Sequence, residues 1–70
     1  MKPPMAGMNA VERRRREKYL TQAQVGQAAG VSGVVVHKIE AGRPIKRTSI
    51  ERIAEVLGLS RRTVRDCIER

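Results

Sequence analysis

The sequence contains almost no aromatic residues, since Tyr19 stands alone and Phe and Trp are absent. A hydrophobic core must therefore consist of Val, Ile, Leu and Ala, which suits a compact helical bundle. Cys67 is the single cysteine, so an internal disulfide is excluded and the reducing cytoplasm is the expected compartment. One histidine and one cysteine cannot complete a metal site, and we expect neither a metal nor another cofactor.

Long hydrophobic runs are missing as well. No apolar stretch approaches the roughly 18 residues of a transmembrane helix, so no insertion into a membrane is expected. Residues 1–8 (MKPPMAGM) lack the apolar segment of a secretion signal and are interpreted as a flexible arm. No nucleophile with a neighbouring base, phosphate-binding loop or metal cluster is recognisable, so we expect neither an enzyme nor a small-molecule substrate.

Positive charge, by contrast, is abundant. Fifteen Lys and Arg residues oppose seven Asp and Glu residues, which gives a formal net charge of +8. A basic domain usually meets a polyanion, most often nucleic acid, and a membrane surface is the competing partner. The 70 residues suffice for one domain, which at this size buries only about 60% of its unfolded surface.

Capping residues and helical spacing predict five short helices in an all-α bundle. The first is expected to run from its cap Asn9 to about Tyr19, and residues 43–47 are expected to form a proline-broken loop. Thr48, with Glu51 three residues later, resembles a capping box at the start of the fourth helix. The other expected caps are Thr21, Ser32 and Ser60, and the expected helix ends are Gly30, Ala41-Gly42 and Gly58.

The β-branched run at residues 34–36 (VVV) argues against this pattern, because local propensity favours a strand there. Its flanks favour a helix: a capping serine precedes it, and Val36 and Ile39 keep helical spacing. We therefore expect tertiary packing to override propensity.

Residues 22–40 read QAQVGQAAGVSGVVVHKIE and fit a pair of tightly crossing helices. Gly26 would let the two helices approach, and Gly30 would make the turn between them. The apolar positions of the crossing are Val25, Ala29, Val31, Val36 and Ile39. This is the pattern of a helix-turn-helix, whose second helix enters the major groove of DNA.

The segment LTQAQVGQAAGVSGVVVHKIEAGRP resembles the DNA-binding domain of lambdoid phage repressors and Cro proteins, the XRE-type family. Residues 20–22 (LTQ) and 39–42 (IEAG) carry most of the likeness, which covers about residues 9–60. The resemblance implies five helices, sequence-specific operator binding and, usually, action as a homodimer. We expect residues 9–70 to form the DNA-binding domain, with the recognition helix at about residues 33–41.

Helix geometry assigns the faces of this recognition helix. At about 100° per residue, Val36 and Ile39 share the core side and Val34 points away from it. The candidate base-contacting residues are Gly33, Val34, Val35, His37 and Lys38. A lysine can donate to guanine, and a valine methyl can meet the methyl group of thymine. Two alternatives stay open: the valines could fill a second packing contact, and His37 could be a solvated surface residue.

Contacts with the phosphate backbone of DNA are expected at the start of the helix-turn-helix and in the loop that follows it. The resemblance places Gln22 against a phosphate, and it places phosphate contacts in the loop after the recognition helix. The candidate phosphate-contacting residues are Gln22, Ser32, Arg43, Lys46 and Arg47. The run of arginines at residues 13–16 covers more than a full turn and is interpreted mostly as a solvated helix face.

Two further positions follow from the comparison with this family. Gly33 departs from its pattern, because many relatives carry a long polar side chain there that bridges to the glutamine and to a base. Specificity must then depend more on other side chains and on DNA shape. The resemblance also offers Arg15 as the partner of Glu40 in a structural ion pair.

Residues 50–68 (IERIAEVLGLSRRTVRDCI) fit the helix-turn-helix template too. Arg61, Arg62 and Arg65 would lie on the outer face of a second recognition helix. The alternative, which the family favours, is that these helices form a packing hairpin. Cys67 and Ile68 could belong either to a dimer interface or to the core.

The expected function is that of a nucleoid-associated transcriptional regulator, a phage- or prophage-type repressor on a palindromic operator in double-stranded DNA. Two other classes stay open. An antitoxin would grip a protein partner, but only residues 1–8 and a short C-terminus are available for this. An architectural or excision factor would mainly bend DNA.

Overall fold

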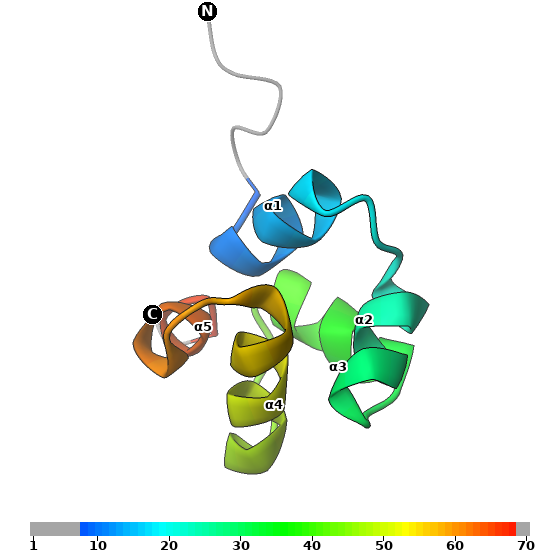
Figure 1. The fold of residues 1–70 in the computed structure, drawn as a ribbon. Coiled ribbons are helices and arrows are strands. Elements are labelled where there is room, and N and C mark those ends of the chain that lie inside the picture. Colours follow the sequence, from blue (N-terminus) through cyan, green and yellow to red (C-terminus); the bar gives the residue numbers. More distant parts are fainter. Residues whose placement is uncertain (1–7, 69–70) are drawn as a thin grey trace, which may run out of the picture.

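The computed structural model describes residues 8–68, within which it contains five α-helices and no strand (Figure 1). The helices are α1 (Ala10–Glu17), α2 (Gln22–Ala29), α3 (Gly33–Glu40), α4 (Arg47–Leu57) and α5 (Arg61–Asp66). The predicted all-α five-helix bundle is therefore confirmed. The expected N-terminal arm, residues 1–8, lies outside the described residues except for Met8.

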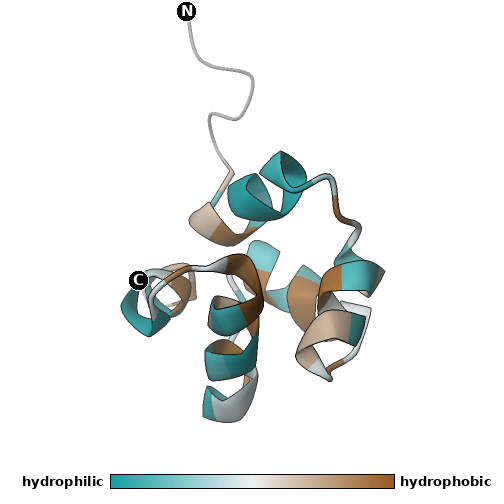
Figure 2. Ribbon diagram, in the orientation of Figure 1, coloured by the Kyte–Doolittle hydropathy of each residue, from teal (hydrophilic) through white to brown (hydrophobic). Residues whose placement is uncertain are grey.

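Each helix contributes to one hydrophobic core, and the apolar residues gather where the helices meet (Figure 2). The largest side chains without exposed surface are Val11, Val25, Val36, Ile39, Ile53, Leu57 and Val64. Burying one such side chain stabilises the fold by about 1.5–3 kcal/mol. Isolated helices shorter than about 12 residues are marginal in water, so this shared burial holds the helices together. None of the helices described is long and apolar enough to cross a lipid bilayer.

The valine run lies in α3, as the packing argument predicted. The Ser32 hydroxyl accepts a hydrogen bond from the Val35 N–H at 3.4 Å, which caps the helix. Val36 and Ile39 have no exposed surface. Core burial therefore outweighs the weak local preference of valine for a strand.

The turns follow the glycines. Gly30 and Gly58 end α2 and α4 with φ angles of 73° and 67°, in the left-handed region. Tyr19 takes the same conformation with a φ of 57°, and α1 therefore ends at Glu17, two residues before the predicted end. A residue in this region cannot continue a right-handed helix.

The predicted start of the fourth helix is wrong. α4 begins at Arg47, with Lys46 as its N-cap, and no side chain accepts a hydrogen bond from its first turn. Thr48 already lies inside this turn, so its hydroxyl cannot act as the cap, and Glu51 approaches Arg61 instead. A capping box occurs at α2, where Thr21 and Gln24 exchange hydrogen bonds of 2.8 and 3.0 Å.

Candidate nucleic-acid interface

The crossing of α2 and α3 depends on two glycines. A Cβ atom at Gly26 would lie 2.7 Å from the backbone carbon of Ser32, which is closer than real Cβ contacts. A Cβ atom at Gly33 would lie 3.0 Å from the Cα atom of Ala23. The two backbones therefore touch at these points. This contact gives a physical reason for the glycine at position 33, where a side chain would press on α2.

The outer face of α3 carries the side chains expected to contact bases. Val34 is 61% exposed, whereas the other valine, leucine and isoleucine side chains within residues 8–68 are buried or half-buried. His37 and Lys38 are exposed beside it, and Val35 is half-buried. A hollow of about 330 Å³ lies between α2 and α3, next to Gly33, and Val34 and His37 form part of its wall. This face thus combines apolar surface with a cation and a hydrogen-bonding ring.

Glu40 joins three helices at the end of α3. Its carboxylate accepts hydrogen bonds from Arg15 Nε at 2.6 Å, from Arg15 Nη2 at 3.0 Å and from Gln22 Nε2 at 3.1 Å. The side chains of Arg15 and Glu40 are only 11% and 5% exposed, so water screens this pair little. The hydrogen bond to Glu40 outweighs the opposing effect of burial and raises the pKa of Arg15 above its usual value. This guanidinium stays charged throughout the physiological range.

Arg15 also donates from Nη1 to the Leu20 carbonyl at 2.9 Å. Its fork therefore ties the α1–α2 turn to α3, in addition to pairing with Glu40. The two-pronged geometry requires arginine, because a lysine ammonium could not make all three contacts from fixed directions.

Gln22 is engaged within the protein. Besides its bond to Glu40, its Nε2 lies 3.4 Å from His37 Nδ1. Gln22 is also a candidate phosphate ligand. The two hydrogens of its amide point to Glu40 and His37, so Gln22 can donate to a phosphate only if it releases His37. Gln22 thereby links the first turn of α2 to the exposed face of α3.

The remaining phosphate candidates lie around the α3–α4 connection. Arg43 and Lys46 are exposed in the loop, and Arg47 is the first residue of α4 rather than part of the loop. The first turn of α4 has no side-chain cap, so its partial positive charge adds to these cations. Ser32 is also exposed, with its hydroxyl oxygen occupied as the cap of α3.

Sequence reasoning missed one residue of this region. It identified Asn9 as a helix cap, and the Asn9 side chain does accept from the Glu12 N–H at 3.0 Å. Its amide also donates to the carbonyls of Ile39 and Glu40, at 2.9 and 3.3 Å. An asparagine can cap one helix and donate to another because its amide has both an acceptor and two donors. The sequence around Asn9 cannot predict a hydrogen bond to Ile39, which lies 30 residues away.

The second helix pair, α4–α5, packs against the same core. Val64 and Cys67 are buried, and the Cys67 thiol donates to the Thr63 carbonyl at 3.3 Å. Cys67 therefore belongs to the core, and Ile68 is half-buried against it. Arg61, Arg62 and Arg65 are exposed on the outside of α5.

Comparison with known proteins identifies the motif. Residues 10–66 match the family model described as a helix-turn-helix domain, which covers most of the chain and all five helices. No match was found among curated proteins. Solved structures gave no match either.

Proposed function

We propose that this chain, which belongs to the helix-turn-helix domain family and hence is a DNA-binding protein, is a sequence-specific transcriptional regulator that places α3 in the major groove. The observation that carries the proposal is the outer face of α3. Exposing 61% of a valine is unfavourable in water. Beside an exposed lysine, however, this valine matches base edges, which offer thymine methyl groups and guanine acceptors.

The surroundings of α3 support backbone contacts on the same side of the molecule. Arg43, Lys46 and Arg47 follow α3 directly, and their charge would fix the register on the duplex without reading bases. If about five phosphates are neutralised, the slope of log K against log salt concentration is expected to be about −4 to −5.

The finer function that fits this interface is that of a phage- or prophage-type repressor. Two copies on a palindromic operator would present two α3 helices to half-sites about one helical turn apart. The resemblance to the phage repressors and Cro proteins supports this reading. Cys67 cannot serve as a dimer contact without leaving the core, so the interface would have to use other residues.

Selection of bound duplexes from a random pool tests the proposal. We expect a defined sequence with two-fold symmetry, from which the half-site spacing follows. Lys38→Ala should lower the affinity for that sequence about tenfold and relax the preference at one base pair. Lys18→Ala removes the same charge from an exposed position after α1 and should do neither.

The outcomes separate the competing functions. A pool that returns no preferred sequence would overturn the proposal. Strong bending of any bound duplex without preference would indicate an architectural factor instead. A Lys38→Ala variant with an unchanged preference would show that α3 does not read the bases.

A further inference from the structure

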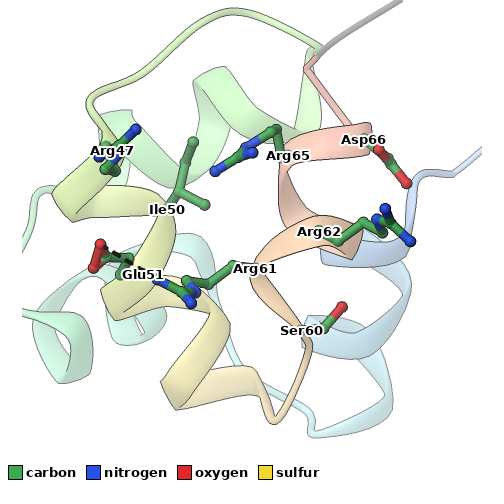
Figure 3. Close-up of a pocket in the computed structure, with 8 residues that line it drawn as sticks. All are labelled: Arg47, Ile50, Glu51, Ser60, Arg61, Arg62, Arg65 and Asp66. Atoms are coloured by element: carbon green, nitrogen blue, oxygen red, sulfur yellow. Dashed lines mark ion pairs between the residues drawn. The ribbon is translucent and has the colours of Figure 1, made fainter.

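A basic cleft lies between α4 and α5, outside the α2–α3 interface. Its volume is about 790 Å³, and the residues that line it include four arginines: Arg47, Arg61, Arg62 and Arg65. The side chains of Arg47, Arg61 and Arg65 lie on the near side of α5 (Figure 3). Only two carboxylates, Glu51 and Asp66, line it as well. The wall of the cleft is therefore positively charged.

The arginines come from both sides of the cleft. Arg47 on α4 and Arg65 on α5 flank Ile50, and Arg61 extends toward Glu51, whereas Arg62 points to the other side of α5 (Figure 3). The Arg61–Glu51 pair is long, at 3.9 Å, and the Arg61 side chain is 70% exposed. An exposed pair of this kind contributes at most about 1 kcal/mol, so Arg61 can turn to another anion at little cost.

The cleft is continuous with the loop after α3. A second hollow, of about 390 Å³, lies between this loop and α5, with Pro44, Ile45, Arg47 and Arg65 in its wall. Arg47 and Arg65 thus line both spaces. The second hollow is otherwise lined by apolar residues, Ile50 and Ile68 among them, so the two arginines are what connects the cleft to the loop.

Stability does not account for this concentration of charge. Arg61 and Arg62 are exposed like charges at adjacent positions of α5, and the long Arg61–Glu51 pair offsets their repulsion only in part. Arginine forks match the oxygens of a phosphate group. The single aromatic residue, Tyr19, does not line the cleft, and Ile50 is its one large apolar side chain. The cleft is thus suited to phosphate groups without a stacked base.

We propose that the α4–α5 cleft binds backbone phosphates of the same duplex, beyond the base pairs that α3 reads. This inference rests on the proposed function, because the duplex must first be placed by α3. It assigns different tasks to the two helix pairs: α2–α3 reads bases, and α4–α5 holds the flanking backbone.

The test compares two charge-matched double variants on duplex DNA. R61Q/R65Q removes two cations of the cleft, and R13Q/R52Q removes two exposed cations outside it. We expect R61Q/R65Q to bind about tenfold more weakly and to reduce the salt slope by about one for each lost phosphate contact. R13Q/R52Q should keep the wild-type slope. Since Arg65 has other interactions, R61Q alone provides a second variant, which removes only an exposed side chain with a long ion pair and should give half of the change.

Duplex length locates the contact. With a duplex trimmed to the base pairs selected by α3, R61Q/R65Q should bind as the wild type does. With about one helical turn added on each side, the difference should return. A loss that persists on the trimmed duplex, or an equal loss in R13Q/R52Q, would overturn the inference. Saturable binding of inorganic phosphate at the arginines, with duplex affinity unchanged in R61Q/R65Q, would overturn it too and assign the cleft to a free anion.

Failure of the proposed function gives a different pattern. A protein without sequence preference, or a Lys38→Ala variant with normal preference, would contradict base reading by α3. The dependence of affinity on Arg61 and Arg65 can still be measured on any long duplex. The two results are therefore distinguishable.

Discussion

The helix pairs α2–α3 and α4–α5 follow one local pattern with different outcomes. In each, a left-handed glycine, Gly30 or Gly58, ends the first helix and a serine, Ser32 or Ser60, caps the second. Both serines accept a hydrogen bond from the backbone three residues later. The two pairs therefore share the glycine and serine that form the turn, and these residues determine the turn without determining a function.

The pairs differ at the positions that surround this corner. Gly26 brings α2 and α3 into backbone contact, whereas the corresponding residue of α4 is Ala54. The last residue of α3 is Glu40, bonded to α1 and α2, and its counterpart beyond α5 is the half-buried Ile68. The orientation of α3 is therefore fixed by directional hydrogen bonds, whereas the end of α5 is held by apolar contact.

The largest expected effect concerns the ion pairs of the two helix pairs. Glu40→Ala should lower the free energy of unfolding by about 3 kcal/mol, because it leaves the buried Arg15 charge unpaired. Glu51→Ala, which removes the exposed partner of Arg61, should change it by less than about 0.5 kcal/mol. Urea denaturation followed by far-ultraviolet circular dichroism measures both. Equal losses would contradict the assignment of Glu40 as an anchor.

A smaller effect is expected at the helix crossings. Gly26→Ala should destabilise the fold by about 2 kcal/mol, since the added methyl group meets the backbone of Ser32. The opposite exchange at the matched position, Ala54→Gly, should lose about 1 kcal/mol through helix propensity. Thermal melting distinguishes them, with about 4–8 °C for each kcal/mol in a domain of this size. A Gly26→Ala variant that melts at or above the wild-type temperature would show that the crossing is looser than described.

Binding should separate the outer faces of α3 and α5. Val34→Ser should change the base preference and leave the salt slope intact, because it removes methyl groups and no charge. Arg61→Ser, on the cleft side of α5, should weaken all sequences alike and reduce the slope. Each change is expected to be about 1 kcal/mol in binding free energy. A reversed result would make α5 the base-reading helix.

The smallest effect concerns the turns that precede the two pairs. Gly42 takes a φ of 77° before α4, whereas Tyr19 takes a φ of 57° before α2. Tyr19→Gly should relieve the steric strain and raise stability by about 0.5 kcal/mol, since the larger unfolded-state entropy of glycine offsets part of the gain. A melting temperature a few degrees higher is the expected result. Tyr19→Ala keeps the strain and should show no increase.

The sequence predicted those features that depend on local chemistry. Glycines and capping serines predicted the turns between the helices of each pair, and helical spacing predicted the burial of Val36 and Ile39 in α3. Prediction was wrong at α4, where a threonine and a glutamate had the right spacing for a capping box but the N-cap, Lys46, lies two residues before Thr48. Several nearby residues can start a helix, and the loop geometry decides among them.

Contacts between distant residues were harder to predict. The proximity of Arg15 and Glu40 followed from family resemblance, not from spacing. The bonds from Asn9 and Gln22 to the end of α3, and the gathering of four arginines around one cleft, depend on how whole helices pack. The sequence showed that arginines are abundant in the last helix, but only the packing of α4 against α5 places Arg47 at the same cleft.

The hydrogen bonds that hold α3 at Glu40 have a consequence for the rate and the enthalpy of DNA binding. A helix fixed from both neighbours loses its orientational freedom when the chain folds, so little ordering is left for the moment of encounter. Binding by such a preformed surface is expected to be faster, and to release less heat, than binding in which the helix orders on contact with DNA. The hydrogen bonds that fix α3 during folding are thus expected to speed its association with DNA.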